Sequence, residues 1–188
     1  ILNYFIKSIK NFLFSFLIFE NKEQKKQNLN KQYFEKLASK KVAFVLHRGI
    51  KKDLLFDKIL YYSDDKNSPL NKYNILHLDY ENFLSPEENL YWVCLRKMKV
   101  SNFKIFLKTL SASIKTCYLI RSWSTFLGWL LCIQKYSVYV EYCEVIQKFK
   151  KLKIAIIDYE ILCPKTLLLA FEKNKVKTVA TQERFIHM

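Results

Sequence analysis

Short apolar segments recur along this chain, and a cluster of polar side chains follows each of them. The segments are rich in β-branched and aliphatic residues, a pattern typical of strands buried in a parallel sheet. We predict strands at Val42–Leu46, Ile75–Leu78, Ile154–Ile157 and Thr178–Ala180. The uninterrupted apolar run at Ile154–Ile157 indicates a strand that is covered on both faces.

Helical patterns fill the connections between these strands. Ser85 and Pro86 form a helix start, because Ser caps the first turn and Pro fits within it. Asn174 is a suitable left-handed end for the last helix, and Gly128 in the longest one would allow close packing or a kink. The predicted helices are 32–38, 85–97, 103–114, 123–150 and 164–174. This order of elements predicts an α/β fold with a mostly parallel, Rossmann-like sheet flanked by helices.

Three regions are expected along the chain: an amphipathic helix at 1–20, a polar linker at 21–41 and the Rossmann-like domain at 42–188. Polar residues recur every four positions from Asn3 to Ser15, which leaves a broad apolar face on the first helix. Its longest apolar run is far shorter than the ~20 residues that span a bilayer. Two interpretations stay open: the helix docks on the protein, or it lies in the membrane interface beside the lysines that follow it.

Polar residues follow each predicted strand directly. Because the carboxyl ends of parallel strands lie at one edge, these residues would line a common rim, where open α/β sheets bind ligands. Carboxylates suit removal of a hydroxyl proton, and Arg or His suits binding of a phosphate or a sugar acid. An ordinary loop or helix-cap role is an equally open interpretation for each residue. The candidates are His47, Arg48, Asp79, Glu81, Asp158, Tyr159, Glu160, Gln182, Glu183 and Arg184.

The segment from Lys153 to Phe185 resembles part of a known protein family. Its carboxyl cluster Asp158-Tyr159-Glu160, its helix start Cys163-Pro164-Lys165 and its run from Lys177 to Arg184 are the residues concerned. They are similar to the amino-terminal half of bacterial surface-polysaccharide glycosyltransferases of type-B architecture, which contain two Rossmann-like domains. The rest of the chain matches that family only in general layout.

The chain departs from the family pattern at the end of its last predicted strand. In the family, a strand reading roughly K-T-V-x-x-Q-H-G enters the cleft between the two domains. Gln182 matches the glutamine, whereas Glu183 and Arg184 replace the histidine and the glycine. The resemblance therefore makes Glu183, together with Asp158, the candidate catalytic residue, and the other rim residues would bind substrate. An ion pair between Glu183 and Arg184 or a neighbouring basic residue is the competing interpretation.

The resemblance implies the acceptor-side half of a glycosyltransferase in surface-polysaccharide or glycolipid biosynthesis. Such an enzyme would act in the cytoplasm or at the cytoplasmic membrane face, on a sugar or lipid-linked acceptor. A nucleotide-sugar donor would be held mainly by a carboxyl-terminal half that this chain lacks. We therefore expect a fragment that is inactive alone and binds no cofactor or metal. Transfer of a polyol phosphate on the same scaffold is an open alternative.

The charge balance has two interpretations: a generic solvated basic surface, which the abundance of Lys, Asn, Ile, Phe and Tyr favours, or a preference for anionic partners. The chain carries 32 Lys and Arg residues against 17 Asp and Glu, a formal net charge of +15, which attracts phosphates and anionic lipid. A non-enzymatic basic α/β module that binds nucleic acid or anionic lipid is therefore a second alternative. Nucleic acid is not the expected partner. Its binding would need a basic stripe interleaved with exposed aromatic residues, whereas the aromatic residues here are spaced mainly like core residues.

The remaining chemistry-bearing residues show no site of their own. The five cysteines are widely spaced without a C-x-x-C pair, so we expect them to be reduced and mostly buried. The three histidines lack metal-ligand spacing, and we predict no structural zinc. With only two glycines, the chain has no G-x-G-x-x-G or P-loop motif.

Overall fold

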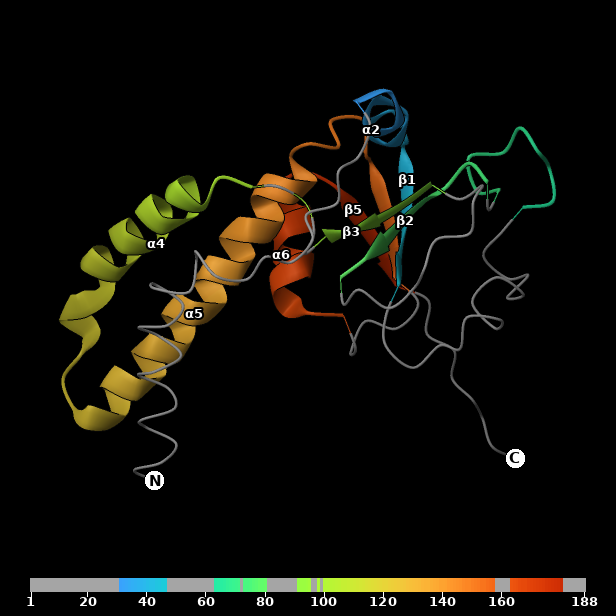
Figure 1. The fold of residues 1–188 in the computed structure, drawn as a ribbon. Helices are drawn as coiled ribbons and strands as arrows, with labels where there is room; N and C mark the ends of the chain where they lie inside the picture. Colours follow the sequence, from blue (N-terminus) through green and yellow to red (C-terminus); the bar gives the residue numbers. More distant parts are fainter. Residues whose placement is uncertain are drawn as a thin grey trace, which may run out of the picture.

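The computed structural model describes residues 31–46, 63–71, 73–80, 91–95, 98, 100–157 and 163–180. Helices and strands alternate in these residues as expected for an α/β fold (Figure 1). The predicted helix at 1–20 lies outside the described residues. The elements are α2 Lys31–Ala38, β1 Val42–Leu46, β2 Leu76–Asp79, β3 Tyr91–Cys94, α4 Asn102–Thr116, the 3-10 helix η3 Cys117–Leu119, α5 Trp123–Ile146, β4 Ile154–Ile157, α6 Lys165–Lys173 and β5 Lys177–Ala180.

The five strands form one all-parallel sheet in the order β3-β2-β1-β4-β5. The chain winds outward from β1 to β3, returns through α4 and α5, and then winds the other way from β4 to β5. This is the strand order of a Rossmann-like sheet, and it confirms the predicted fold class. The winding direction changes between β1 and β4, which are neighbours with Val45 opposite Ile157.

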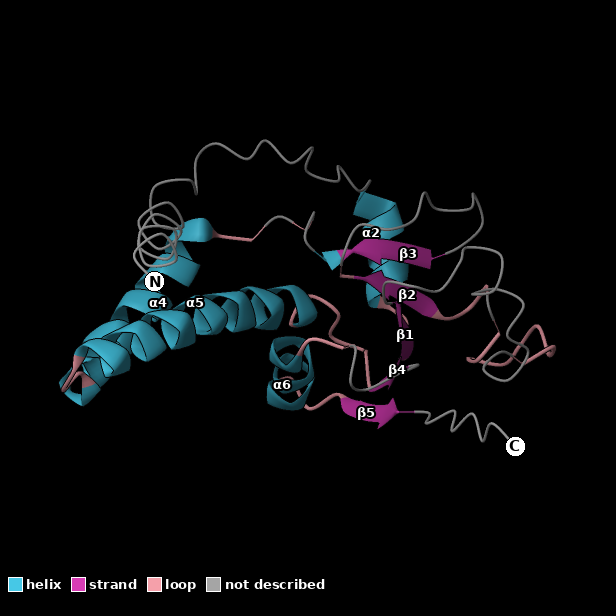
Figure 2. Cartoon of the chain, turned by 90° about the horizontal axis from the view of Figure 1, so that it is seen from below, coloured by secondary structure: helices cyan, strands magenta, loops and turns pink. Residues whose placement is uncertain are grey.

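Helices cover one face of the sheet. α5 and α6 lie on the same side of the strands, with α4 beyond α5 (Figures 1 and 2). Successive strand residues point to opposite faces, and those on the helical side are enclosed. This core contains Ala43, Val45, Leu76, Leu78, Val93, Ala155 and Ile157 from the strands, with Val145 and Ile146 from α5 and Leu167, Ala170 and Phe171 from α6. Removal of this apolar surface from water is the main stabilising contribution to the fold.

α2 closes the core at the edge where the strands begin. Leu37 is fully buried, and the rings of Phe34 and Phe149 lie 5.9 Å apart. Tyr33 stacks on Tyr91 at a centroid distance of 6.5 Å. α2 confirms the predicted short helix and lies within the stretch predicted as a polar linker, so residues 31–38 belong to the folded body.

β3 corrects one sequence prediction. The helix predicted at 85–97 does not extend through Tyr91–Cys94, because these residues pair with Leu76–Asp79 of β2 as a parallel strand. The segment is aromatic and β-branched, and such side chains favour a pleated, half-buried surface. The predicted start at Ser85 lies outside the described residues.

β4 is covered less evenly than predicted. Ala155 and Ile157 are buried on the helical side, whereas Ile154 is 36% exposed and Ile156 is partly exposed. Only one face of this strand is fully covered. All four residues of β5, the neighbouring edge strand, are exposed.

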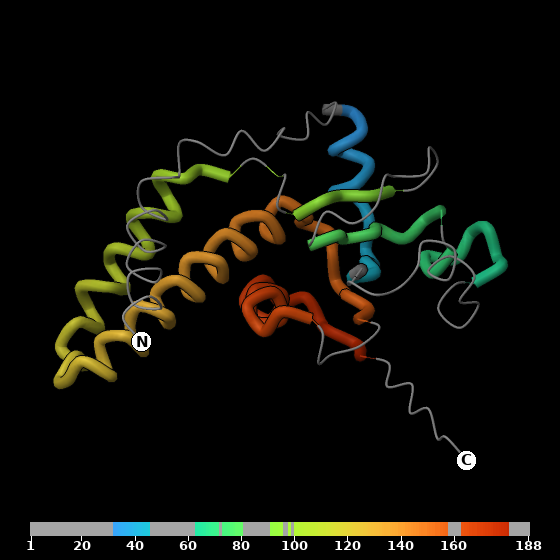
Figure 3. The backbone as a smooth tube through the Cα atoms, turned by 60° about the horizontal axis from the view of Figure 1, so that its bottom comes forward, coloured from blue at the N-terminus to red at the C-terminus, as the bar shows by residue number. Residues whose placement is uncertain are grey.

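α4 and α5 form a helical hairpin that projects away from the sheet (Figure 3). Its two helices confirm the helices predicted at 103–114 and 123–150, although α5 ends at Ile146. Near the sheet, Glu144 accepts hydrogen bonds from Lys104 Nζ and Lys108 Nζ, both at 2.7 Å. Burial opposes ionisation of Glu144, but the two ammonium groups outweigh it and lower the pKa of the carboxyl. No helix in the described ranges is long and apolar enough to cross a membrane.

Replacing Gly128 by Ala is expected to raise the free energy of unfolding by about 0.5–1 kcal/mol, the usual cost of glycine in a helix. Gly128 was expected to permit close packing, but a Cβ built there meets nothing within 4 Å. Alanine therefore fits, and it reduces the conformational entropy of the unfolded chain. Urea denaturation of both proteins measures the effect, and a destabilised variant would show that the glycine is required.

Two local predictions are wrong. Asn174 caps α6 with a φ of −91°, and the left-handed residue is Lys175, with a φ of 58°. The five cysteines are free but not mostly buried, because Cys117 and Cys132 are exposed and Cys143 is half-buried. A local pattern locates the end of a helix to within a residue or two but does not show which residue is left-handed. It also marks a cysteine as apolar without showing whether the side chain faces solvent.

Candidate functional site

The carboxyl ends of the strands form one continuous edge. Asp79 is in register with both Leu46 and Cys94, and Ile157 is in register with both Val45 and Ala180. The four predicted strands are direct neighbours, in the order β2-β1-β4-β5, and β3 lies outside them. Since adjacent strands lie ~4.8 Å apart, the ends of neighbouring strands lie side by side along this edge.

The change in winding direction marks one position on this edge. In open α/β sheets, ligands bind outside the carboxyl ends of the strands where neighbouring connections leave toward opposite faces. Here that position lies between β1 and β4. The segments that follow these two strands begin at His47 and Asp158, which are both candidate site residues.

Asp79 is the one predicted site residue that the described residues include. It is the last residue of β2 and only 1% exposed. Its side chain is therefore enclosed at the carboxyl edge of the sheet. The other candidates lie outside the described residues, so their placement stays a prediction: His47, Arg48, Glu81, Asp158, Tyr159, Glu160, Gln182, Glu183 and Arg184.

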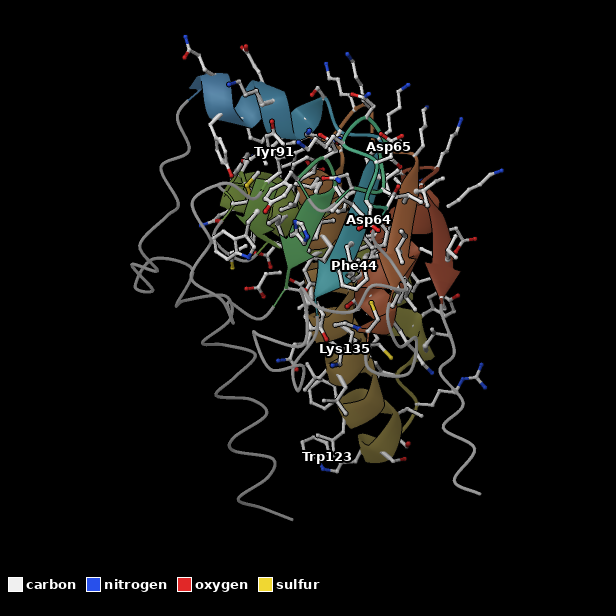
Figure 4. The ribbon with its side chains drawn as sticks, turned by 90° about the vertical axis from the view of Figure 1, so that its right-hand side faces the viewer. Phe44, Asp64, Asp65, Tyr91, Trp123 and Lys135 are labelled. Atoms are coloured by element: carbon white, nitrogen blue, oxygen red, sulfur yellow. The ribbon has the colours of Figure 1, made fainter. Side chains whose placement is uncertain are left out.

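The face of the sheet opposite α5 and α6 holds two groups that sequence reasoning did not place at the site. Figure 4 looks onto this face, with Phe44 of β1 toward the viewer. His77 is in register with Phe44 on one side and Trp92 on the other. In the described part of the chain, the buried indole N–H of Trp92 has no hydrogen-bond partner. The run of strand-forming residues at 91–94 was the signal that could have placed Trp92 on a strand.

His77 is a neutral, enclosed histidine. It is fully buried, and its Nδ1 lies 3.3 Å from the carbonyl oxygen of Tyr91. Burial lowers the pKa of the imidazole to about 4, against the opposing effect of this backbone contact. His77 therefore carries no charge near neutral pH. It lies two residues before Asp79 on β2, so the two side chains are on the same face of the sheet.

Two hollows lie beside α6. A groove of about 620 Å³ runs along α6 and β5, and it reaches the carboxyl ends of β4 and β5 at Ile157 and Ala180. A second groove of about 760 Å³ lies between α5 and α6. Its floor contains Leu131 and Tyr139, and three lysines border it. Only the first groove adjoins the candidate edge.

The described side chains form no group of three or more His, Cys, Asp or Glu that is placed to hold a metal ion. The comparisons with known proteins add no family to this geometry. Protein-family models, curated protein sequences and solved structures were each searched, and none matches the chain.

Proposed function

We propose that this chain is the acceptor-side half of a glycosyltransferase in surface-polysaccharide or glycolipid biosynthesis. The observation that supports the proposal is the all-parallel sheet with its change of winding direction between β1 and β4. In open α/β sheets, ligands bind at such a change of winding direction, outside the carboxyl ends of the strands. An antiparallel β4–β5 pair would have removed the basis for the proposal, whereas the pair is parallel.

The proposed chemistry needs one base near the acceptor hydroxyl. Glu183 or Asp158 takes the hydroxyl proton while the acceptor oxygen attacks the anomeric carbon of the donor sugar. The bond from that carbon to the nucleoside diphosphate breaks, and the diphosphate leaves with the electron pair. His47, Arg48 and Arg184 bind phosphate or acidic sugar groups. Asp79 is enclosed, so it is not expected to contact the substrate directly.

In this mechanism, a second Rossmann-like half makes most of the contacts with the nucleotide sugar. The residues of this half orient the acceptor, and residues of the other half stabilise the leaving diphosphate. A polyol-phosphate donor would use the same crevice with a different leaving group. The choice between the two donor classes is therefore an outcome of the experiment.

The test is a transfer assay on the full gene product with its native membranes as the acceptor source. Nucleotide sugars and CDP-linked polyols are supplied in turn, and release of the nucleotide is measured. Turnover with a nucleotide sugar is the expected result. Turnover only with a CDP-linked polyol would replace sugar transfer by polyol-phosphate transfer, and no release with any donor would contradict both.

Glu183→Gln is expected to reduce that turnover by roughly a hundredfold or more, the usual contribution of a general base. Circular dichroism should show an unchanged fold, because glutamine keeps the shape of the side chain. Glu35→Gln is the matched control, since Glu35 is exposed on α2 at the edge where the strands begin. Retained turnover in Glu183→Gln would remove this residue from the mechanism and leave Asp158→Asn as the next variant to measure.

A further inference from the structure

The end of the α4–α5 hairpin exposes an unusual set of apolar side chains. Tyr118 is 72% exposed, Ile114 65%, Trp123 59% and Leu119 52%. These residues lie around the turn between the two helices, and Figure 4 shows Trp123 far from the sheet. Contiguous exposed apolar surface of this kind marks an interaction site rather than ordinary protein surface. We call residues 114–126 the hairpin tip.

Hydrogen bonds hold the hairpin tip in a defined shape. Thr125 Oγ1 accepts hydrogen bonds from the backbone N–H groups of Ser122 at 2.8 Å and Arg121 at 3.0 Å. Ser122 Oγ accepts one from the backbone N–H of Thr125, which completes a capping box at the start of α5. Trp129 Nε1 donates to Thr116 Oγ1 at 2.9 Å, and this bond joins α5 to the end of α4. The apolar side chains are therefore presented on an ordered turn.

The charges around the hairpin tip have a single sign. Residues 101–140 contain five basic side chains and no Asp or Glu. Lys104 and Lys108 bind Glu144 near the sheet, which leaves Lys115, Arg121 and Lys135 along the outer part of the hairpin. This combination of aromatic and aliphatic residues with cations complements an anionic bilayer, because Trp and Tyr favour the headgroup level and cations attract acidic lipids.

Three other partners fit the hairpin tip less well than an anionic bilayer. A second copy of the chain would bring like-charged tips together, which opposes self-association. Residues 1–19 carry Lys7 and Lys10 and no carboxylate, so they offer no complementary charge either. Nucleic acid would match the cations but would leave Ile114 and Leu119 without an apolar partner.

We propose that the hairpin tip is a membrane-docking element for an anionic bilayer. Tyr118, Leu119 and Trp123 enter the boundary between headgroups and acyl chains, while Lys115 and Arg121 contact lipid phosphates. The tip extends toward the side on which the strands end (Figures 1 and 4). Docking therefore turns the carboxyl edge of the sheet toward the membrane. The proposal does not depend on the function proposed above.

Vesicle sedimentation of the whole chain tests this proposal. Zwitterionic phosphatidylcholine vesicles are compared with vesicles that also contain phosphatidylglycerol as about one third of their lipid. The wild-type chain should bind the anionic vesicles, and roughly 0.5 M salt should weaken that binding by screening. A chain that ignores anionic vesicles would overturn the proposal.

Variants of the hairpin tip separate it from other membrane-binding segments. Leu119→Ser combined with Trp123→Ser should weaken the partition by about tenfold or more, and Arg121→Glu by about thirtyfold. The matched controls are Leu169→Ser, because Leu169 on α6 is also 52% exposed, and Lys151→Glu at an exposed position before β4. Both controls should bind like the wild type, and circular dichroism checks that each variant is folded.

Three outcomes would contradict docking through the tip. Unchanged vesicle binding in the tip variants would assign the membrane contact to another segment, such as residues 1–19. A change from dimer to monomer in sedimentation equilibrium, with vesicle binding unaffected, would make the tip a self-association surface. Loss of binding to a duplex DNA probe without loss of vesicle binding would make it a nucleic-acid surface.

Discussion

Phe171→Ala is expected to destabilise the protein by about 3–5 kcal/mol, the usual cost of removing a buried phenyl ring. Phe171 is fully buried in the core between α6 and the sheet. Its carbonyl oxygen also accepts a hydrogen bond from Val176 N at 2.9 Å, in the turn that leads to β5. Loss of the ring therefore leaves a cavity beneath the unit that carries β4, α6 and β5.

Denaturation in urea, monitored by circular dichroism, measures this change. Leu169→Ala is the matched control, because Leu169 lies two residues away on the same helix but is 52% exposed. We expect it to change the free energy of unfolding by about 0.5 kcal/mol or less. Equal destabilisation by the two variants would show that α6 does not pack on the sheet as described.

Acidification is expected to destabilise the protein through His77. The pKa of the imidazole is lowered to about 4 in the folded protein, against about 6.5 in an unfolded chain. Between these values the unfolded chain takes up a proton that the folded chain excludes, so stability falls as the pH falls. The free energy of unfolding falls by about 2 kcal/mol by pH 5 and by about 3 kcal/mol by pH 4. Above pH 7 this effect of His77 is negligible.

A comparison with His77→Leu isolates this contribution, because other groups titrate in the same range. Asp79 and Cys94, on the same face of the sheet, are unchanged in the variant. Loss of the contact with Tyr91 alters the stability of His77→Leu at pH 7, so the informative quantity is the difference between pH 7 and pH 5. That difference should be smaller in the variant by about 2 kcal/mol. Equal differences in the two proteins would mean that His77 is charged in the folded state.

Local sequence patterns were sufficient for four of the five strands. β1 and β4 match the predicted bounds, and β2 and β5 differ from them by one residue at the ends. Each is a short β-branched or aliphatic run between polar clusters, so its signal is contained in its own residues. β3 was missed because Ser85 and Pro86 indicate a helix start, whereas the strand Tyr91–Cys94 depends on pairing with β2, a contact between distant residues.

The edge shared by the strand ends was predictable from the sequence, but the burial of the residues near it was not. Polar clusters after parallel strands had to share an edge, and the pairing of β2, β1, β4 and β5 places their ends together. Sequence did not show that Asp79 is enclosed or that His77 is neutral, because burial is set by neighbouring strands. The sequence also did not show that Trp123 and Leu131 are exposed, because a buried core helix and a projecting hairpin can have the same spacing of apolar residues.

Hydrogen–deuterium exchange of the full gene product shows whether substrates bind at the carboxyl edge of the sheet. Exchange is measured with and without the donor and acceptor that support turnover, and protection is mapped to peptides. We expect protection in peptides that include the carboxyl ends of the strands: 44–50, 79–83, 156–162 and 179–185. Protection confined to other segments, such as the groove between α5 and α6, would contradict a substrate site at the junction of β1 and β4.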